Sequence, residues 1–278
     1  MVAEDGYGAK DSFPSVLIAI LAKQKEKFLP LYLECIERFD YPRSAIHLYI
    51  RTNNNTDNTK NILRAWLERI GSSYASVEFD AQDVSEQVER YGVHEWNPLR
   101  FRVVGQIRNT SLHKALKRNC QFYFVADVDN FIRPETLKSL VSLNLPIVAP
   151  LLRMISPDDP YSNFHAAADA NGYYKEVPHY HVLLHRRIRG IIEVPVVHCT
   201  YLIRASVIPD LTYQDNTDRH EYVVFSDVAR TRGIAQYLDN RLVYGNILFE
   251  RRTLNEQMEQ IKQARCNLSI AEDLFAAN

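Results

Sequence analysis

The sequence has few cysteines, and their spacing excludes two common kinds of site. There are four in 278 residues, at Cys35, Cys120, Cys199 and Cys266, and they form no C-x-x-C pair. Such wide spacing indicates neither a zinc site nor a disulfide framework. We therefore expect all four thiols to lie in the protein core.

An excess of charge and long apolar runs are also absent. The 33 basic and 34 acidic residues leave a net charge of −1, which argues against nucleic acid or an anionic membrane as a partner. No window approaches about 18 uninterrupted apolar residues. The N-terminus, MVAEDGYGAKDSFPS, is acidic and polar where a signal peptide would be basic and then apolar. We expect a cytoplasmic protein without a membrane span.

Glycine is scarce, with 9 in the chain, and none follows the first apolar run, which continues as AILAKQKEK. A nucleotidyltransferase would carry a glycine-rich, basic phosphate loop at that point, so this chemistry is disfavoured. The chain also lacks repeats and low-complexity linkers. Its 46% apolar and 24% charged residues are typical of a globular protein that buries a sizeable core.

The first half of the chain alternates between strand and helix periodicity. Apolar runs predict strands at 15–22, 46–50, 77–79, 122–126 and 147–150, and helical spacing predicts helices at 28–39, 59–70, 102–118 and 134–143. Gly71 is expected to end the second helix, and the polar stretch up to Pro98 is expected to be a loop. This alternation is typical of a mostly parallel sheet flanked by helices.

The pattern changes after residue 150. Residues 151–220 mix Pro, Tyr and His with short strand-like runs such as 191–197, which favours an α+β continuation over a second independent core. We expect a flexible N-terminus over 1–14, a single domain over 15–252 and a helical tail over 253–278.

Two acidic residues follow the apolar run at 122–126. The segment reads FYFVADVDNF, so Asp127 and Asp129 flank Val128 at the end of an expected central strand. On an extended backbone both side chains would point to the same side and could converge on one hard cation, such as Mn²⁺ or Mg²⁺. Ligands bind at this edge of open parallel sheets. The alternative is that both acids accept hydrogen bonds from loop N–H groups and cap the next turn.

A polar loop, RTNNNTDNT at 51–59, follows the second expected strand. A metal-binding acid pair beside such a loop suits a sugar nucleotide, because the cation would neutralise the charge that develops on a leaving diphosphate. The pattern therefore favours glycosyl transfer.

Seven segments match one known family in order. They are VLIAILAKQKEKFLPLYLECIERFDYPR, LYIRTNNNTDNTKNILRAWL, YFVADVDNFIRPETL, VAPLLR, YSNFHAAADANGYYKEVP, VPVVHCTYLI and a final YG. The chain from Val16 to about Gly245 thereby resembles the amino-terminal glycosyltransferase domain of the procollagen galactosyltransferases, which has an α/β fold of the GT-A type. The resemblance implies a UDP-hexose donor, Mn²⁺ or Mg²⁺ as cofactor, and inverting transfer of galactose or glucose to a hydroxyl acceptor. That acceptor would be a protein hydroxylysine or a glycan.

The resemblance also assigns donor-side roles. Asp127 and Asp129 would hold the metal. The nucleotide sugar would contact strand ends, the polar loop and one helix arginine, namely Ala19, Leu21, Ala22, Thr52, Asn53, Asp57, Asn58, Arg108, Asp127 and Val128. For Arg108, a surface position is an equally good interpretation. On this basis residues 15–130 would form a nucleotide-binding half and residues 131–252 an acceptor-side half.

On the acceptor side the resemblance implies one aromatic segment and one base. The sugar and acceptor would contact Tyr161, Ser162, Asn163, Phe164, Tyr173, Tyr174 and His198. The aromatic residues among them could equally be core, and His198 could be a structural histidine. Inversion needs a base for the acceptor proton. Glu221 in DRHEYVVF is the candidate, with Asp218 and Asp227 behind it, and a solvated glutamate at a helix start is the alternative.

One departure from the family pattern bears on activity. Related domains often supply a late histidine as a further metal ligand after the Y-G, whereas this chain reads FERRTL, with Arg251 and Arg252. An arginine cannot be a ligand of a cation. A domain that binds a sugar nucleotide or a glycan without catalysis is therefore the second hypothesis.

Overall fold

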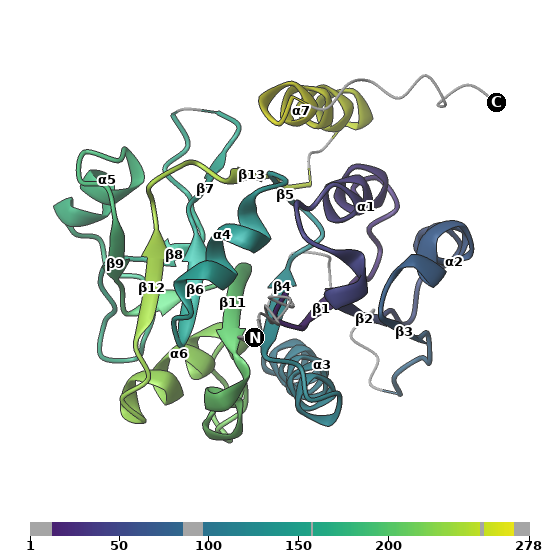
Figure 1. The fold of residues 1–278 in the computed structure, drawn as a ribbon. Coiled ribbons are helices and arrows are strands. Elements are labelled where there is room, and N and C mark those ends of the chain that lie inside the picture. Colours follow the sequence, from purple (N-terminus) through teal and green to yellow (C-terminus); the bar gives the residue numbers. More distant parts are fainter. Residues whose placement is uncertain (1–12, 86–96, 157, 251–252, 270–278) are drawn as a thin grey trace, which may run out of the picture.

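The computed structural model describes residues 13–85, 97–156, 158–250 and 253–269. Most of the expected flexible N-terminus, most of the loop expected before Pro98, and Arg251 with Arg252 lie outside these residues. The described part is built around one eight-stranded sheet, with helices on both of its faces (Figure 1).

The order of strands in this sheet is β3-β2-β1-β4-β11-β6-β12-β9. The bounds are β1 (Val16–Leu21), β2 (Ile46–Arg51), β3 (Ser76–Asp80), β4 (Phe122–Ala126), β6 (Ile147–Pro150), β9 (Ile191–Glu193), β11 (Thr200–Arg204) and β12 (Gln236–Asp239). Strands β3, β2, β1 and β4 are parallel to one another, and β6 is parallel to β12. Because β11 runs antiparallel to β4 and β6, and β9 antiparallel to β12, the sheet is mixed. The predicted α/β class is confirmed.

Two small sheets complete the second half. One contains β5 (Asn130–Ile132), β13 (Gly245–Ile247) and β7 (Leu152–Met154), and the other contains β8 (Phe164–His165) and β10 (Val196–Val197). The run 191–197, expected as one strand, is split between β9 and β10 around Pro195, which has no N–H for a ladder. A Cβ at Gly245 would lie 2.0 Å from the carbonyl oxygen of Phe131, so the pairing of β13 with β5 requires glycine there.

Helices cover both faces of the sheet, and the four that periodicity predicts in the first half of the chain are present. The helices are α1 (Leu29–Glu37), α2 (Thr59–Ile70), α3 (Pro98–Lys117), α4 (Thr136–Leu143), α5 (Pro178–Leu184), α6 (Glu221–Thr231) and α7 (Leu254–Asn267). Helix α3 begins earlier than expected because the Asn97 side chain accepts a hydrogen bond from the N–H of Arg100 at 3.0 Å. Helix α2 ends at Ile70 with Gly71 as its C-cap, as expected, but Gly71 has a φ of −55° instead of a left-handed conformation, and the chain continues into a 3-10 turn.

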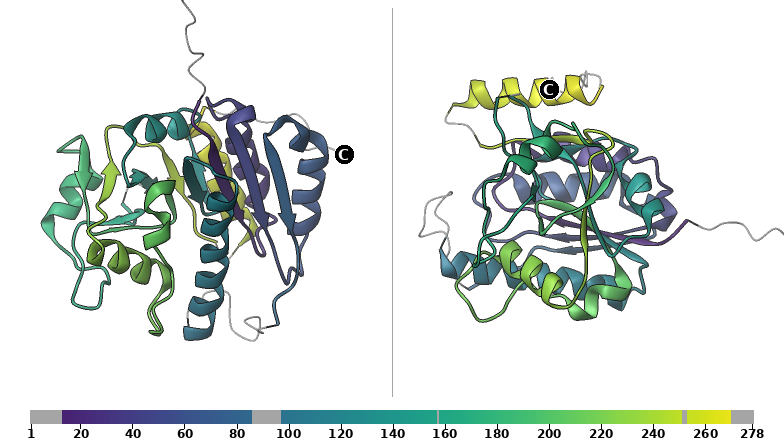
Figure 2. Two further views of the ribbon diagram at one scale, coloured as in Figure 1. Left: turned by 60° about the horizontal axis from the view of Figure 1, so that its bottom comes forward. Right: turned by 90° about the vertical axis from the view of Figure 1, so that its left-hand side faces the viewer.

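The core consists of one apolar layer on each face of the large sheet. Alternate residues of β1 supply the two layers: Ile18 and Ile20 pack with α1, α2, α4 and α7, whereas Leu17 and Ala19 pack with α3, α5 and α6. Figures 1 and 2 show α3 and α6 on the face opposite α1 and α7. Both halves of the chain therefore share one sheet.

Two expectations from composition can be compared with this core. All four cysteines are free thiols; Cys35 and Cys120 are buried, but Cys266 is exposed, so the expectation of four core thiols is wrong. Over the residues that the structure describes, no helix is both long and apolar enough to cross a bilayer.

Candidate active site

Asp127 and Asp129 lie in a tight turn directly after β4, at the edge where the parallel strands end. The N–H of Asn130 donates to the carbonyl oxygen of Asp127 at 2.9 Å, which is the hydrogen bond of a β-turn. Val128, between the two acids, is buried. The expectation of an extended backbone is therefore wrong, because the chain turns around the buried valine.

Asp127 forms an ion pair with Arg108 of α3. Nη2 of Arg108 donates to Oδ1 of Asp127 at 2.8 Å, and the side chains are 10% and 32% exposed. Loss of hydration raises the pKa of Asp127, although Arg108 opposes this. Burial acts to lower the pKa of Arg108, but Asp127 and further neighbours outweigh it and raise that pKa. Arg108 is thus a buried partner of the turn and not a surface arginine.

Asp129 forms an ion pair with Lys25, a residue that the sequence analysis did not single out. Nζ of Lys25 donates to Oδ2 of Asp129 at 2.8 Å, and the side chains are 27% and 22% exposed. Burial acts to lower the pKa of Lys25, but Asp129 and then Asp127 outweigh it and raise the pKa. The sequence signal was the basic run AKQKEK, which follows the first strand toward the same edge as the acids.

Side-chain hydrogen bonds join the loop after β1 to the polar loop after β2. Gln24 has a left-handed φ of 54°, and its N–H donates to Oδ1 of Asn55 at 2.9 Å. Oδ2 of Asp57 accepts from the N–H of Glu26 at 3.0 Å, and its Oδ1 accepts from the N–H of Thr59 at 3.1 Å. The carboxylate of Asp57 therefore braces the two loops, a role that differs from the expected nucleoside contact.

Some of the other donor-side candidates are buried in the core, and the rest lie near the carboxyl edge of the sheet. Ala19, which was expected to contact the nucleotide sugar, is fully buried within β1, and its side chain lies in the core. Thr52 and Asn53 are buried where β2 ends. Leu21 and Ala22, at the end of β1, are half-buried and buried, and Asn58, just before α2, is exposed.

Glu221 begins α6 and is buried beside Arg108. Its Oε1 lies 3.5 Å from Nε of Arg108 and its Oε2 lies 2.5 Å from Nδ1 of His220, with the carboxylate side chain 5% exposed. Burial acts to raise the pKa of Glu221, but His220 and then Arg108 outweigh it and lower the pKa. The solvated-glutamate alternative is therefore wrong. We call Asp127, Arg108, Glu221 and His220 the buried charge network.

A glycine allows this network to form. A Cβ at Gly105 of α3 would lie 2.9 Å from the carbonyl oxygen of Tyr213 and 3.5 Å from Cβ of Glu221. The absence of a side chain at Gly105 therefore lets α3 pack closely on the backbone at Tyr213, in the segment that leads to Glu221. The guanidinium of Arg108 also lies 5.8 Å from the ring centroid of Tyr213.

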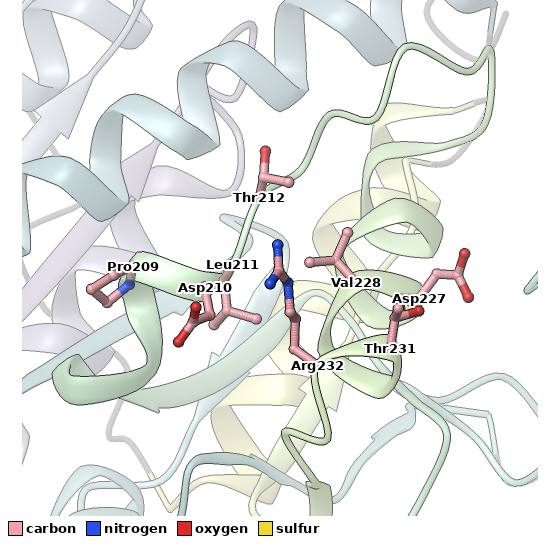
Figure 3. A pocket seen from close by; sticks show the side chains of 8 residues that line it. All are labelled: Pro209, Asp210, Leu211, Thr212, Asp227, Val228, Thr231 and Arg232. Carbon is pink, nitrogen blue, oxygen red and sulfur yellow. The ribbon is translucent and has the colours of Figure 1, made fainter.

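The other two carboxylates expected as catalytic candidates form ion pairs outside the buried charge network. Asp218 is 72% exposed and lies 3.6 Å from Arg102. Asp227 lies 3.0 Å from Arg219 and 2.9 Å from Arg230. It also lines a pocket with a volume of about 350 Å³ between α6 and the 3-10 helix η4 (Ala205–Asp210). Figure 3 shows the Asp227 carboxylate pointing away from the other side chains that line this pocket.

Two expected acceptor-side residues serve the fold. Asn163 is fully buried, and its Oδ1 accepts from the N–H of Leu152 at 3.0 Å while its Nδ2 donates to the carbonyl oxygen of Pro150 at 2.8 Å. Phe164 is buried and stacks on Tyr180, with ring centroids 4.9 Å apart. Because their polar and apolar surfaces are used internally, neither side chain is available to a ligand.

A cluster of aromatic and imidazole rings links the remaining candidates to the buried charge network. Ring centroids are 5.8 Å apart between Tyr161 and His198, 5.0 Å between His198 and Tyr222, and 4.6 Å between Tyr222 and His220. Tyr161 is 37% exposed, whereas His198 is buried, and burial lowers the pKa of His198. Of the other expected residues, Ser162 is buried, Tyr173 is half-buried and Tyr174 is exposed.

The turn formed by Asp127, Val128 and Asp129, which we call the D-x-D turn, offers two carboxylates to a cation. Across the described ranges, no three or more His, Cys, Asp or Glu side chains are grouped so as to hold a metal ion. Each carboxylate uses one oxygen in its ion pair, which leaves Oδ2 of Asp127 and Oδ1 of Asp129 for another ligand. Two carboxylate oxygens at a partly exposed edge fit a hard cation whose other ligands are water and phosphate oxygens.

Solved structures with the same fold define the class of protein. The chain aligns with S. aureus TarS 1-349 in complex with UDP-GlcNAc at a TM-score of 0.55 and 14% identity, over 93% of this chain and 68% of that one. It aligns with the mannosyltransferase PcManGT from Pyrobaculum calidifontis in complex with GDP-Man and Mn²⁺ at a TM-score of 0.54 and 15% identity, over 90% and 61%. The protein therefore has the GT-A glycosyltransferase fold, as predicted.

The chain belongs to glycosyltransferase family 25: residues 13–265 match the model of its N-terminal domain. It is 35% identical over 260 residues to procollagen galactosyltransferase 2 of Homo sapiens, covering 89% of this chain and 41% of that protein. It is 31% identical over 250 residues to inactive glycosyltransferase 25 family member 3 of Mus musculus, covering 85% and 41%. The chain spans about two fifths of the length of these relatives. The predicted family is confirmed.

These relatives overturn the expected cytoplasmic location. Several are named for procollagen, which is synthesised in the secretory pathway. The expectation came from the polar N-terminal residues and the absence of a long apolar run, and it is wrong for a member of this group.

Proposed function

We propose that this domain transfers a hexose, galactose or glucose, from a UDP-hexose donor to a hydroxyl acceptor with inversion. The observation that carries the proposal is the placement of Asp127 and Asp129, both partly exposed, in the turn after β4. This turn lies at the carboxyl edge of β1, β2 and β4, where ligands bind in open parallel sheets. The names of the procollagen galactosyltransferase relatives and the UDP-GlcNAc complex of TarS support a UDP-sugar donor. The acceptor would be a protein hydroxylysine or a glycan.

We infer that Asp127 and Asp129 hold a divalent cation, Mn²⁺ or Mg²⁺. When bound, the cation would neutralise charge that develops on the leaving diphosphate. The Mn²⁺ complex of PcManGT, which has the same fold, supports a divalent cation as cofactor. Residues 15–130 would then bind the donor and residues 131–252 the acceptor, with the tail over 253–278 outside the reaction.

Glu221 is the proposed base. The pKa of Glu221 is lowered, so its carboxylate is ionised at neutral pH. In one displacement the acceptor oxygen would bond to the anomeric carbon while its proton passes to Glu221 and the diphosphate oxygen leaves with its electron pair. The aromatic cluster from Tyr161 to His220 would line the approach of the acceptor.

One observation favours a second function, the binding of a sugar nucleotide without transfer. Both carboxylates of the D-x-D turn are already neutralised, Asp127 by Arg108 and Asp129 by Lys25. Relatives named inactive are about as similar to this chain as some of those named galactosyltransferases. In this second function UDP would bind, but no sugar would be released or transferred.

Hydrolysis and transfer of UDP-galactose and UDP-glucose, with and without Mn²⁺, test the first function. Asp129→Ala should lower turnover by about 100-fold or more, because it removes one of two carboxylates at the diphosphate. Asp40→Ala is the matched control, since Asp40 is 62% exposed and pairs with Lys138 on the surface. Undiminished turnover in Asp129→Ala would refute the metal role. UDP binding by calorimetry without release of sugar would favour the second function.

A further inference from the structure

Lys25 places an ammonium group on one of the two carboxylates proposed to hold the cation. Its Nζ lies 2.8 Å from Oδ2 of Asp129 and 5.0 Å from the ring centroid of Phe28. The distance to Asp129 is that of a direct charge-assisted hydrogen bond. The ammonium group of Lys25 therefore already neutralises a carboxylate that a divalent cation would bind.

The backbone holds Lys25 in this position. Its N–H donates to Oγ1 of Thr59 at 2.7 Å, and its carbonyl oxygen accepts from the N–H groups of Phe28 and Leu29, each at 3.0 Å. The preceding residue, Gln24, is fixed by its hydrogen bonds to the loop after β2. The turn that leads into α1 and the loop after β2 thus fix the backbone at Lys25, which an incidental surface lysine would not require.

The two ion pairs of the turn differ in how easily they can open. Arg108 is 10% exposed and also faces Glu221 at 3.5 Å, so moving it would remove the cation from Asp127 and from one oxygen of Glu221. Lys25 is 27% exposed and has a flexible four-carbon stem. Its neighbours with negative charge are Asp129, Asp127 and Glu250. Of the two basic groups at the turn, Lys25 is the one that can exchange partners.

We propose that Lys25 competes with the divalent cation for Asp129 and moves to the donor's diphosphate when the cation and the donor bind together. The proposal rests on the proposed function, since it assumes a diphosphate ligand at this edge. Without a donor, a cation at Asp129 would face the ammonium group at close range, and like charges disfavour that state. With a donor, the phosphate oxygens supply the negative charge that Lys25 needs, and Asp129 is released to the cation.

The proposal predicts strong coupling between Mn²⁺ and UDP, and it can be measured without turnover. Mn²⁺ binding to the whole chain would be followed by electron paramagnetic resonance of the free ion, with and without UDP. Lys25→Met should bind Mn²⁺ alone about tenfold more tightly than the wild type, because the competing charge is gone. The complex with both ligands should lose the contact between Lys25 and the diphosphate. The coupling between Mn²⁺ and UDP should therefore shrink, by the same factor whichever ligand is titrated.

Lys27→Met is the matched control. Lys27 lies on the same loop, is 38% exposed, and is 3.9 Å from Glu250, so this variant removes the same charge without touching Asp129. Its affinity for Mn²⁺ should stay within about twofold of the wild type. Thermal unfolding of both variants would show that the fold is retained.

Equal affinity of the wild type and Lys25→Met for Mn²⁺ alone would overturn the proposal. An equal gain in Lys27→Met would do so as well, because the effect would then be one of general charge. So would the absence of Mn²⁺ binding in Lys25→Met, since removal of the competitor should expose the site. Failure of the proposed function is a different result: no UDP binding and no donor turnover by the wild type, whatever Lys25→Met does with Mn²⁺.

Discussion

The two sides of the D-x-D turn carry the same kind of ion pair in different surroundings. On the Asp127 side, Arg108 is enclosed between α3 and α6 and is shared with Glu221. On the Asp129 side, Lys25 comes from a loop and keeps about a quarter of its side chain exposed. A buried pair is costly to break, whereas a partly exposed pair is weak and can be exchanged. The Asp127 side therefore suits a fixed framework and the Asp129 side suits ligand entry.

The largest expected effect comes from removing Arg108, the partner of Asp127. Arg108→Met should lower the free energy of unfolding by about 3–5 kcal/mol, because Asp127 and Glu221 would both lose their buried cation. Lys25→Met should lower it by less than about 1 kcal/mol. Urea denaturation of both variants measures the difference. An equal loss of unfolding free energy in both variants would mean that burial does not distinguish the Arg108–Asp127 pair from the Lys25–Asp129 pair.

A second contrast lies between the buried carboxylate and the exposed one near it. Glu221→Gln keeps the shape of the side chain but removes its charge, so transfer should fall by about 100-fold or more if Glu221 is the base. Asp218→Asn, at a side chain that is 72% exposed, should retain activity. Initial rates at saturating donor provide the measurement. Loss of activity in Asp218→Asn without a loss in Glu221→Gln would identify the exposed Asp218 as the base.

The sequence predicted the strands on the donor side well, but it did not predict the partners of the acids. The predicted bounds of β4 and α2 agree with the structure, because each is a long apolar run or helical pattern with clear ends. Lys25 and Asp129 are 104 residues apart in the chain. Their contact depends on β1 lying beside β4, and local periodicity carries no information about that order.

On the acceptor side the sequence named the right segments and misjudged several side chains. Asn163 looked like a ligand-binding amide, yet it satisfies the backbone of β6 and β7. Short strands such as β8 and β10 leave many backbone groups unpaired, and buried polar side chains must pair with them. Whether an asparagine serves the fold or a ligand depends on those long-range contacts, which its flanking residues do not reveal.

The smallest expected effect is a dependence of stability on pH that comes from Glu221, on the Asp127 side of the turn. Because the pKa of Glu221 is lowered in the folded protein, its charge contributes stability that is fully present above the ordinary glutamate pKa of about 4.3–4.5 and is lost as the pH falls through the lowered, folded-state value. The stability difference between wild type and Glu221→Gln should therefore be constant near neutral pH and shrink below about pH 4.5. Urea denaturation from pH 7 to about pH 3 measures it. A difference that grows on acidification would mean that burial, and not Arg108 with His220, controls the carboxylate.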